Sequence, residues 1–401
     1  MDFRLSDDQT LLRRTVREFA EAEIRPHVME WDEAQTFPAS LLPKLASLGL
    51  MGVQFPESYG GAGMSALDYC ICIEELARVC PSIALSVAAH NGLCSAHLFM
   101  FGSDAQKQKY LVPLAEGRYL GAWGLTESGA GSDAASMRTV ARRTRAGEDG
   151  AGEDQWVLDG SKQFITHAAT GGVMVVMAVT DRAKGHRGIS AFVVEQGTPG
   201  MRPGKKEDKL GMRASETSEV IFEGCRLPAA AIVGAEGEGF INTLQVLDAG
   251  RIGIAALAVG LAEGAYDAAR GYAKERRQFG QPIGSFQAIQ WKLADNACRI
   301  EAARLLTYRA AWMKDKGQRT TRESSIAKLY SSEIAVRAAE DAVQIFGGYG
   351  FVKDYPAEKY FRDVKLTTIG EGTSEIQRLV IARQLLAPRT NGAGRGAPAS
   401  E

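Results

Sequence analysis

The sequence shows little excess charge and contains few cysteines or histidines. Its 401 residues carry 47 Lys and Arg against 48 Asp and Glu, a formal net charge of -1. A balance this even excludes a general electrostatic attraction to nucleic acid or to an acidic membrane. The six cysteines and five histidines match no zinc-binding spacing, so we expect no metal site. We predict buried free thiols at all of the cysteines: Cys70, Cys72, Cys80, Cys94, Cys225 and Cys298.

Targeting and membrane-spanning segments are also missing from the pattern. The first residues, MDFRLSDDQ, lack the basic stretch and apolar run that make a signal peptide. The apolar run at residues 172–179 is far too short to span a bilayer. We therefore expect a soluble, cytoplasmic protein with no membrane or nucleic-acid partner.

Three composition regimes follow one another along the chain. Residues 1–121 read as a helical domain, because apolar side chains recur at helical spacing in a charged background. Residues 122–235 contain short β-type runs separated by turns, which favours an antiparallel barrel or sandwich. Among these turns, Asp159-Gly160-Ser161 predicts a hairpin. Residues 236–388 return to long helical stripes typical of a helix bundle, and residues 389–401 are expected to be disordered.

One carboxylate near the C-terminal end, Glu371, lies between two glycines. Gly370 and Gly372 carry no Cβ, so a ligand can approach the backbone closely there. A carboxylate held at such a point is suited to abstracting a proton beside a carbonyl group. The alternative for this segment alone is a solvated acid at the start of a helix that Thr373 and Ser374 could cap.

A glycine-rich segment, GLTESGAGSD (124–133), joins the helical and β regimes. Its glycines fit the dinucleotide pattern G-x-G-x-x-G/A only formally, because strand-like sequence follows where that motif requires a helix. Backbone N–H groups with the hydroxyls of Thr126 and Ser132 are better suited to a flavin ring and its phosphates. An ordinary glycine turn is the alternative.

Several segments together resemble, in sequence and in order, the signatures of the acyl-CoA dehydrogenase family. The likeness is greatest to its short-chain, butyryl-CoA branch and covers nearly the whole chain except the tail. The segments that carry it are GLTESGAGSD (124–133), FIT (164–166), KKEDKLGMR (205–213), LDAGR (247–251), ERRQFG (275–280), QIFGGYGF (344–351), YFRDV (360–364) and EGTSEIQR (371–378).

The resemblance implies an α+β fold: an N-terminal helical domain, a middle β-barrel-like domain and a C-terminal four-helix bundle. It implies FAD as cofactor and oxidation of a short-chain acyl-CoA to the trans-2-enoyl-CoA. Glu371 then takes the α-proton of the thioester while the β-hydride passes to the flavin. The backbone N–H of Glu371 and a ribityl hydroxyl of FAD stabilise the enolate oxygen. Electrons go to an electron-transfer flavoprotein, and the enzyme forms a homotetramer, a dimer of dimers.

The resemblance also assigns binding residues. The flavin of the same chain is expected to contact Trp123, Leu125, Thr126, Gly131, Ser132, Phe164, Ile165 and Thr166. The cofactor site shared with a neighbouring subunit is expected to contain Arg276, Gln278, Phe279, Gln287, Gln344, Gly348, Thr373 and Glu375. The acyl-CoA is expected to contact Ser132, Asp248, Arg251 and Gly372. From the residues alone, Arg276 also fits a solvated helix end, and Asp248 with Arg251 fits a surface ion pair.

Departures from the family pattern leave the substrate open. Gly250 stands where some branches carry the base, so Glu371 has no competitor, and Gly370 stands where straight-chain enzymes often have tyrosine. The missing side chain at Gly370 predicts tolerance for branched acyl groups. Phe164 replaces a frequent tryptophan and His167 a frequent asparagine, neither of which should alter the chemistry. Fatty-acid and branched-chain amino-acid breakdown both remain open, as do an acyl-CoA oxidase and a non-catalytic flavin- or acyl-CoA-binding protein.

Overall fold

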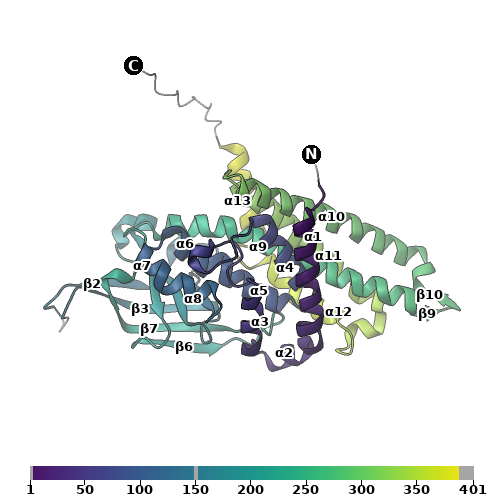
Figure 1. Cartoon of the computed structure of the whole chain (residues 1–401), viewed down its shortest axis with the longest axis horizontal. Helices are drawn as coiled ribbons and strands as arrows, with labels where there is room; N and C mark the ends of the chain where they lie inside the picture. The colour runs from purple at the N-terminus through teal and green to yellow at the C-terminus, as the bar shows by residue number, and fades with distance from the viewer. Residues whose placement is uncertain (1–2, 149–151, 388–401) are drawn as a thin grey trace, which may run out of the picture.

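A computed structural model describes residues 3–148 and 152–387 of the chain. The predicted disordered tail, 389–401, lies outside these residues. Helices form both ends of the described chain and a sheet forms its middle, so the α+β prediction is confirmed. Figure 1 shows the sheet at one end of the long axis and a helical bundle extending to the other.

The N-terminal region is helical, as its apolar periodicity predicts. Ser6 and Ser65 start helices with capping boxes, in which each serine hydroxyl accepts a hydrogen bond from the third backbone N–H of its helix. The apolar faces of these helices pack on one another and on the C-terminal bundle. The helices are α1 (Asp7–Phe19), α2 (Val28–Ala34), α3 (Leu42–Ser47), α4 (Ala66–Val79), α5 (Pro81–Ala89), α6 (Ala96–Phe101), α7 (Asp104–Gln106) and α8 (Val112–Ala115).

An eight-stranded sheet forms the middle region, in the order β6-β7-β3-β2-β4-β5-β8 with β1 paired to β4. Pairing is antiparallel except at β4, which runs parallel to β1 and β2. The expectation of an antiparallel arrangement was therefore wrong at these two pairings. The strands are β1 (Gly121–Gly124), β2 (Val140–Thr144), β3 (Gln155–Thr166), β4 (Val173–Val179), β5 (Ile189–Glu195), β6 (Met201–Lys206), β7 (Thr217–Pro228) and β8 (Ile232–Val233).

The hairpin predicted at Asp159-Gly160-Ser161 was also wrong. β3 runs without a turn through these residues, and its two halves pair with the same strand, β7. The register shifts between Leu158 and Gly160, which marks a β-bulge. Gly160 has φ +141°, and an added Cβ would lie 2.7 Å from the Cα of Thr139. The glycine is thus needed for a close backbone approach, which the Asp-Gly pattern does not distinguish from a turn.

The C-terminal region is a helical bundle whose long helix, α9, also contacts the N-terminal helices. Gly317 has φ +67° and lies just after α10, which is typical of the glycine that follows a helix end. A small hairpin of β9 (Arg277–Gln278) and β10 (Gln281–Pro282) follows α9. The helices are α9 (Gly239–Glu275), α10 (Gln287–Asp315), α11 (Thr321–Phe346), α12 (Ala357–Val364) and α13 (Ser374–Leu386).

Two stretches are long and apolar enough to cross a membrane by length and composition alone, Pro81–Phe101 and Gly239–Glu275. In each, 72% of the most apolar window is buried inside the protein. Both stretches are therefore core helices of this fold, because their apolar faces are already covered by neighbouring elements.

The cysteines follow the prediction with one exception. Cys70, Cys72, Cys80, Cys94 and Cys225 are buried free thiols, whereas Cys298 on α10 is exposed. The prediction was wrong for Cys298 because the apolar stripe of α10 does not include its position. No group of three or more His, Cys, Asp or Glu suited to a metal ion occurs within residues 3–148 and 152–387.

The contact between α4 and α9 depends on a bare backbone at Gly260, where an added Cβ would lie 2.1 Å from the carbonyl oxygen of Glu74. We expect Gly260→Ala to lower the free energy of unfolding by about 1–3 kcal/mol, because a packed interface tolerates added volume poorly. Gly271→Ala is the control on the same helix, since no atom lies within 4 Å of its added Cβ. It should raise stability by about 0.5–1 kcal/mol through helix propensity. Urea denaturation midpoints measure both, and equal midpoints would contradict this packing.

Candidate active site

Glu371 lies in a strained loop between the 3₁₀ turn Lys365–Thr368 and α13. It has φ +53°, in the left-handed region that side chains other than glycine rarely adopt, and Gly372 follows with φ +95°. The Thr373 hydroxyl caps α13 by accepting a hydrogen bond from the Ile376 backbone N–H at 3.3 Å, as predicted. Backbone strain of this kind persists where surrounding contacts hold it, and it is frequent at functional sites.

The carboxylate of Glu371 points inward, against the bare backbone of α9. Its Oε2 atom is buried and has no hydrogen-bond partner among the described residues. An ideal Cβ at Gly250 would lie only 2.3 Å from that oxygen, so a larger residue there would displace the carboxylate. Burial raises the pKa of Glu371 to about 7, although Lys328 and then Arg251 act to lower it. The alternative of a solvated acid was therefore wrong.

Two buried cations come from different helices beside the carboxylate. Lys328 of α11 is fully buried and donates a hydrogen bond of 2.8 Å to the carbonyl oxygen of Gly372. Arg251 of α9 is 5% exposed and pairs with Asp248 at 2.6 Å. Asp248 and Arg251 therefore form the ion pair that the sequence offered as an alternative, but the arginine of this pair is buried and does not lie at the surface. Sequence reasoning missed Lys328, because its distance in sequence from Glu371 gives no sign that they meet.

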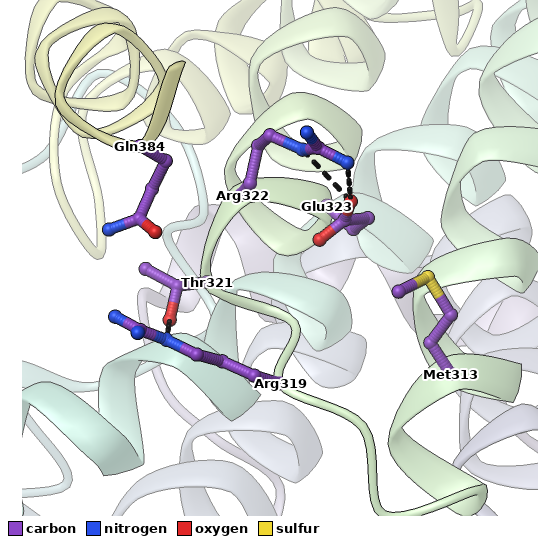
Figure 2. A pocket seen from close by; sticks show the side chains of 6 residues that line it. All are labelled: Met313, Arg319, Thr321, Arg322, Glu323 and Gln384. Atoms are coloured by element: carbon purple, nitrogen blue, oxygen red, sulfur yellow. Dashed lines mark hydrogen bonds and ion pairs between the residues drawn. The ribbon is translucent and has the colours of Figure 1, made fainter. Parts of the chain in front are cut away.

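Beside this pair lies an open pocket of about 280 Å³ at the start of α11 (Figure 2). The Thr321 hydroxyl donates to Asp248 at 2.6 Å and accepts from Arg319 at 3.3 Å. Arg322, which pairs with Glu323 at 2.6 Å, supplies a second guanidinium to the lining. Sequence reasoning missed these residues, although two arginines around a threonine at a helix start could have indicated an anion-binding surface.

The glycine-rich loop after β1 is anchored by a buried ion pair. Glu127 accepts hydrogen bonds from Lys162 Nζ at 2.7 Å and from the backbone N–H groups of Arg138 and Thr139 at 2.6 and 3.0 Å. Burial lowers the pKa of Lys162 to about 8, against the raising effect of Glu127. Strand β2 follows the loop, so no Rossmann-type helix opens there. The loop is thus a preformed element held by charge.

The anchored loop and the end of β3 present groups that fit a flavin. The hydroxyls of Thr126, Ser132 and Thr166 make no hydrogen bond to other residues that the structure describes, which leaves them available to a ligand. Phe164 has φ +60° and is 61% exposed, an apolar ring standing at the surface next to them. The Gln163 N–H donates to the Thr126 carbonyl at 2.8 Å, which joins the two segments.

The remaining predicted flavin contacts lie on β1, on β3 and in the loop that follows β1. Trp123 on β1 is partly buried and donates from its indole nitrogen to His97 at 3.2 Å, while Leu125 and Ile165 are buried and Gly131 is exposed. An isoalloxazine ring needs an apolar wall to pack against. Its polar atoms and the phosphates need hydrogen-bond donors, which the free hydroxyls and the open glycine backbone supply. The residues present therefore fit FAD.

The residues predicted for a cofactor site shared between subunits lie elsewhere in the chain. Arg276 ends α9, and its guanidinium carbon lies 5.4 Å from the centre of the Tyr349 ring. Phe279, in the β9–β10 hairpin, is 92% exposed. Figure 1 shows this hairpin at the end of the molecule opposite the sheet. Four more residues assigned to the shared cofactor site are also exposed: Gln278, Gln287, Gln344 and Gly348.

The structure thus brings Glu371, Gly372, Asp248 and Arg251 together around α9, but it does not bring the hairpin residues to the glycine-rich loop of the same chain. We call residues 369–373, which contain Glu371 and lead into α13, the base loop. Thr373 belongs to the base loop as the cap of α13, and Glu375 is exposed in the first turn of α13.

Comparison with known proteins agrees with this arrangement. Models of the acyl-CoA dehydrogenase N-terminal, middle and C-terminal domains match residues 6–118, 122–225 and 237–386. The chain is 47% identical over 385 residues to a short-chain specific acyl-CoA dehydrogenase of Clostridium acetobutylicum, covering 96% of this chain and all of that one.

Solved structures give the same result. Butyryl-CoA dehydrogenase from Megasphaera elsdenii is 44% identical, with a TM-score of 0.92 over 96% of this chain and 100% of that one. A chain from a structure of the electron transferring flavoprotein of Acidaminococcus fermentans is 46% identical, with a TM-score of 0.93 over the same shares. The prediction of FAD as cofactor is confirmed. The chain belongs to the acyl-CoA dehydrogenase family.

Proposed function

We propose that this enzyme oxidises short-chain acyl-CoA, branched acyl groups included, to the trans-2-enoyl-CoA and passes the electrons to an electron-transfer flavoprotein. The observation that carries the proposal is the buried, unpartnered carboxylate oxygen of Glu371. An acid with a pKa of about 7 is matched to proton abstraction near neutral pH. Relatives named for short-chain substrates and for an electron transferring flavoprotein support the substrate and the acceptor.

In this proposal Glu371 takes the α-proton of the thioester. Its backbone N–H makes no hydrogen bond to the described residues, so it is available to the thioester oxygen, where negative charge develops. FAD, when bound, supplies the acceptor for the β-hydride. The residues assigned to hold it in the same chain are Trp123, Leu125, Thr126, Gly131, Ser132, Phe164, Ile165 and Thr166.

The CoA portion is assigned to the surface between α9 and the start of α11. Asp248 and Arg251 offer an acceptor and a donor for the amides of pantetheine, and Ser132 and Gly372 are the other residues assigned to the acyl-CoA. Arg319 and Arg322 add positive charge next to this pair, which suits a polyanionic nucleotide.

A buried tyrosine supports the short-chain assignment. Tyr69 of α4 is 3% exposed, and its hydroxyl would lie 2.9 Å from an added Cβ at Gly253, one turn along α9 from Gly250. Its ring therefore fills space beside the Glu371 carboxylate that a longer acyl chain would need. Gly250 faces the Glu371 carboxylate and Leu93, and Gly253 faces the Tyr69 ring.

The separation between the hairpin and the glycine-rich loop supports an assembly of several subunits. If Arg276, Gln278, Phe279, Gln287, Gln344 and Gly348 contact FAD with Thr373 and Glu375, a second chain must bring its own sheet to that end. A dimer of dimers in the cytoplasm, with domains divided at about residues 121 and 235, is the arrangement we propose.

The first experiment is an anaerobic titration of the purified protein with butyryl-CoA, followed through the visible flavin band. Bleaching requires FAD, a competent base and a short acyl pocket. We expect it, because the proposed function provides all three. A band that bleaches only with longer or aromatic thioesters would contradict the short-chain assignment. Rapid peroxide formation in air would show that oxygen, and not an electron-transfer flavoprotein, is the electron acceptor.

Replacing the base tests its assignment directly. We expect Glu371→Gln to keep FAD and acyl-CoA binding while turnover falls about a hundredfold to ten-thousandfold, because the amide cannot accept the proton. Glu340→Gln is the control, since this acid pairs with Arg337 at 3.1 Å on the outer face of α11. Turnover with butyryl-CoA measures both. Activity retained in the Glu371 variant would mean that another group is the base.

The pH dependence of kcat/KM reports the same group in the free enzyme. Only the ionised carboxylate accepts a proton, and burial raises the Glu371 pKa from 4.5 to about 7. We therefore expect kcat/KM to rise about tenfold per pH unit below that value and to level off above it. A limb that stays near 4.5 would show that the carboxylate is solvated before substrate binds.

Branched substrates test the role of Gly370. An added Cβ there would meet only Leu366, at 3.5 Å, so side chains of different size fit without backbone clash. Isobutyryl-, 2-methylbutyryl- or isovaleryl-CoA should react within about tenfold of butyryl-CoA, and Gly370→Tyr should slow the branched substrates selectively. Gly370→Ala serves as the control for the loss of glycine. Uniformly poor reaction of all three branched substrates in the wild type would refute the idea.

A further inference from the structure

A fully buried lysine lies under the base loop without a carboxylate partner. Lys328 is 0% exposed, and its one hydrogen bond to the described residues goes to the Gly372 carbonyl oxygen at 2.8 Å. Within residues 3–148 and 152–387, no carboxylate oxygen comes within 4.0 Å of its ammonium. Burying an ammonium is costly unless it is paired, so a position of this kind calls for a compensating role.

Four ionisable side chains from four elements lie around the base loop: Arg251, Tyr69, Glu375 and Lys328. Arg251 of α9 faces Glu371 but is paired with Asp248. Tyr69 of α4 is neutral, because burial raises its pKa well above the usual value. Glu375 of α13 is exposed at the surface and acts on Lys328 more weakly than Glu371 does. The unshared positive charge next to the Glu371 carboxylate is therefore that of Lys328.

The same ammonium belongs to a set of hydrogen bonds that hold the carbonyl side of the loop. Gln377 Nε2 donates to the Gly372 carbonyl at 2.8 Å and to the Glu371 carbonyl at 3.3 Å. One turn along α11 from Lys328, the Ser332 hydroxyl donates to the Thr367 carbonyl at 2.8 Å. Fixing these carbonyls sets the direction of the peptide planes and hence of the strained Glu371 backbone.

We propose that Lys328 is a positioning residue for the catalytic base. Its ammonium fixes the Gly372 carbonyl in the base loop, and its positive charge favours the ionised form of the buried Glu371 carboxylate. The proposal rests on the proposed function of Glu371 and extends it to a second residue, from a helix that the sequence does not link to the loop.

The electrostatic part has a definite sign. Burial raises the pKa of Glu371 to about 7, and Lys328 is the largest influence that lowers it. Burial also lowers the pKa of Lys328 to about 8, while Glu371 raises it. The charges of Lys328 and Glu371 thus each favour the ionised form of the other group. Removing that charge must move the ionisation of Glu371 to higher pH.

The test compares four variants at positions 328 and 332. Lys328→Met removes the charge and the hydrogen bond. Lys328→Gln removes the charge but keeps a donor, and serves if the methionine variant does not fold. Lys328→Arg keeps the charge. Ser332→Ala removes a neutral, buried hydrogen bond from the same helix and leaves the charges unchanged.

Two readouts are measured on the FAD-loaded enzyme. One is the pH profile of kcat/KM with butyryl-CoA. The other is the infrared band of the protonated Glu371 carboxyl against pH, assigned by its absence in Glu371→Gln. We expect both to shift upward by about 1 pH unit in the methionine and glutamine variants. The arginine and Ser332→Ala variants should titrate like the wild type.

An unshifted limb in both neutral variants overturns the proposal, as does an equal shift in Ser332→Ala, which would reveal a structural effect. Failure of the proposed function looks different: the wild type itself would then show no acid limb near pH 7 or no turnover of acyl-CoA.

Discussion

The active site depends on one constraint: the carboxylate of Glu371 is packed against the bare backbone of α9. At Gly250 the distance from an ideal Cβ to Oε2 would be 2.3 Å, so the helix can accept the base only where it has no side chain. The packing removes water from the carboxylate and thereby raises its pKa. It also forces Glu371 into a left-handed conformation that an unsupported loop would leave.

Buried charges hold the two halves of the site in place. Lys162 and Glu127 anchor the glycine-rich loop to the sheet, and Lys328 anchors the base loop to α11. Each lysine is buried away from water, so its ammonium group must donate hydrogen bonds to protein groups. These hydrogen bonds hold the partner groups in place. Both loops of the candidate site are thus held by buried contacts to the sheet and to α11.

Charged residues also follow one another from Glu371 to the open pocket at the surface. Glu371 lies against Gly250, the Arg251–Asp248 pair lies next along α9, and Arg319 and Arg322 line an open pocket beside that pair. In the function proposed above, the thioester binds at Glu371 and the polyanionic nucleotide binds at the pocket. The hairpin at the far end of the bundle exposes Phe279 and Gln278, well away from the sheet.

The sequence by itself determined the α+β order, the helix stripes and the segments that identify the family. Apolar periodicity and local motifs are properties of neighbouring residues, which is why Glu371, the glycine-rich loop and the Thr373 cap could be predicted. Gly160 shows the limit, because an Asp-Gly pair serves a bulge as well as a turn. The tertiary structure alone decided that Cys298 is exposed, that β4 pairs in parallel, and that Lys328 meets the base loop. These outcomes depend on which distant elements come into contact, and the burial that shifts the pKa of Glu371 arises only from those contacts.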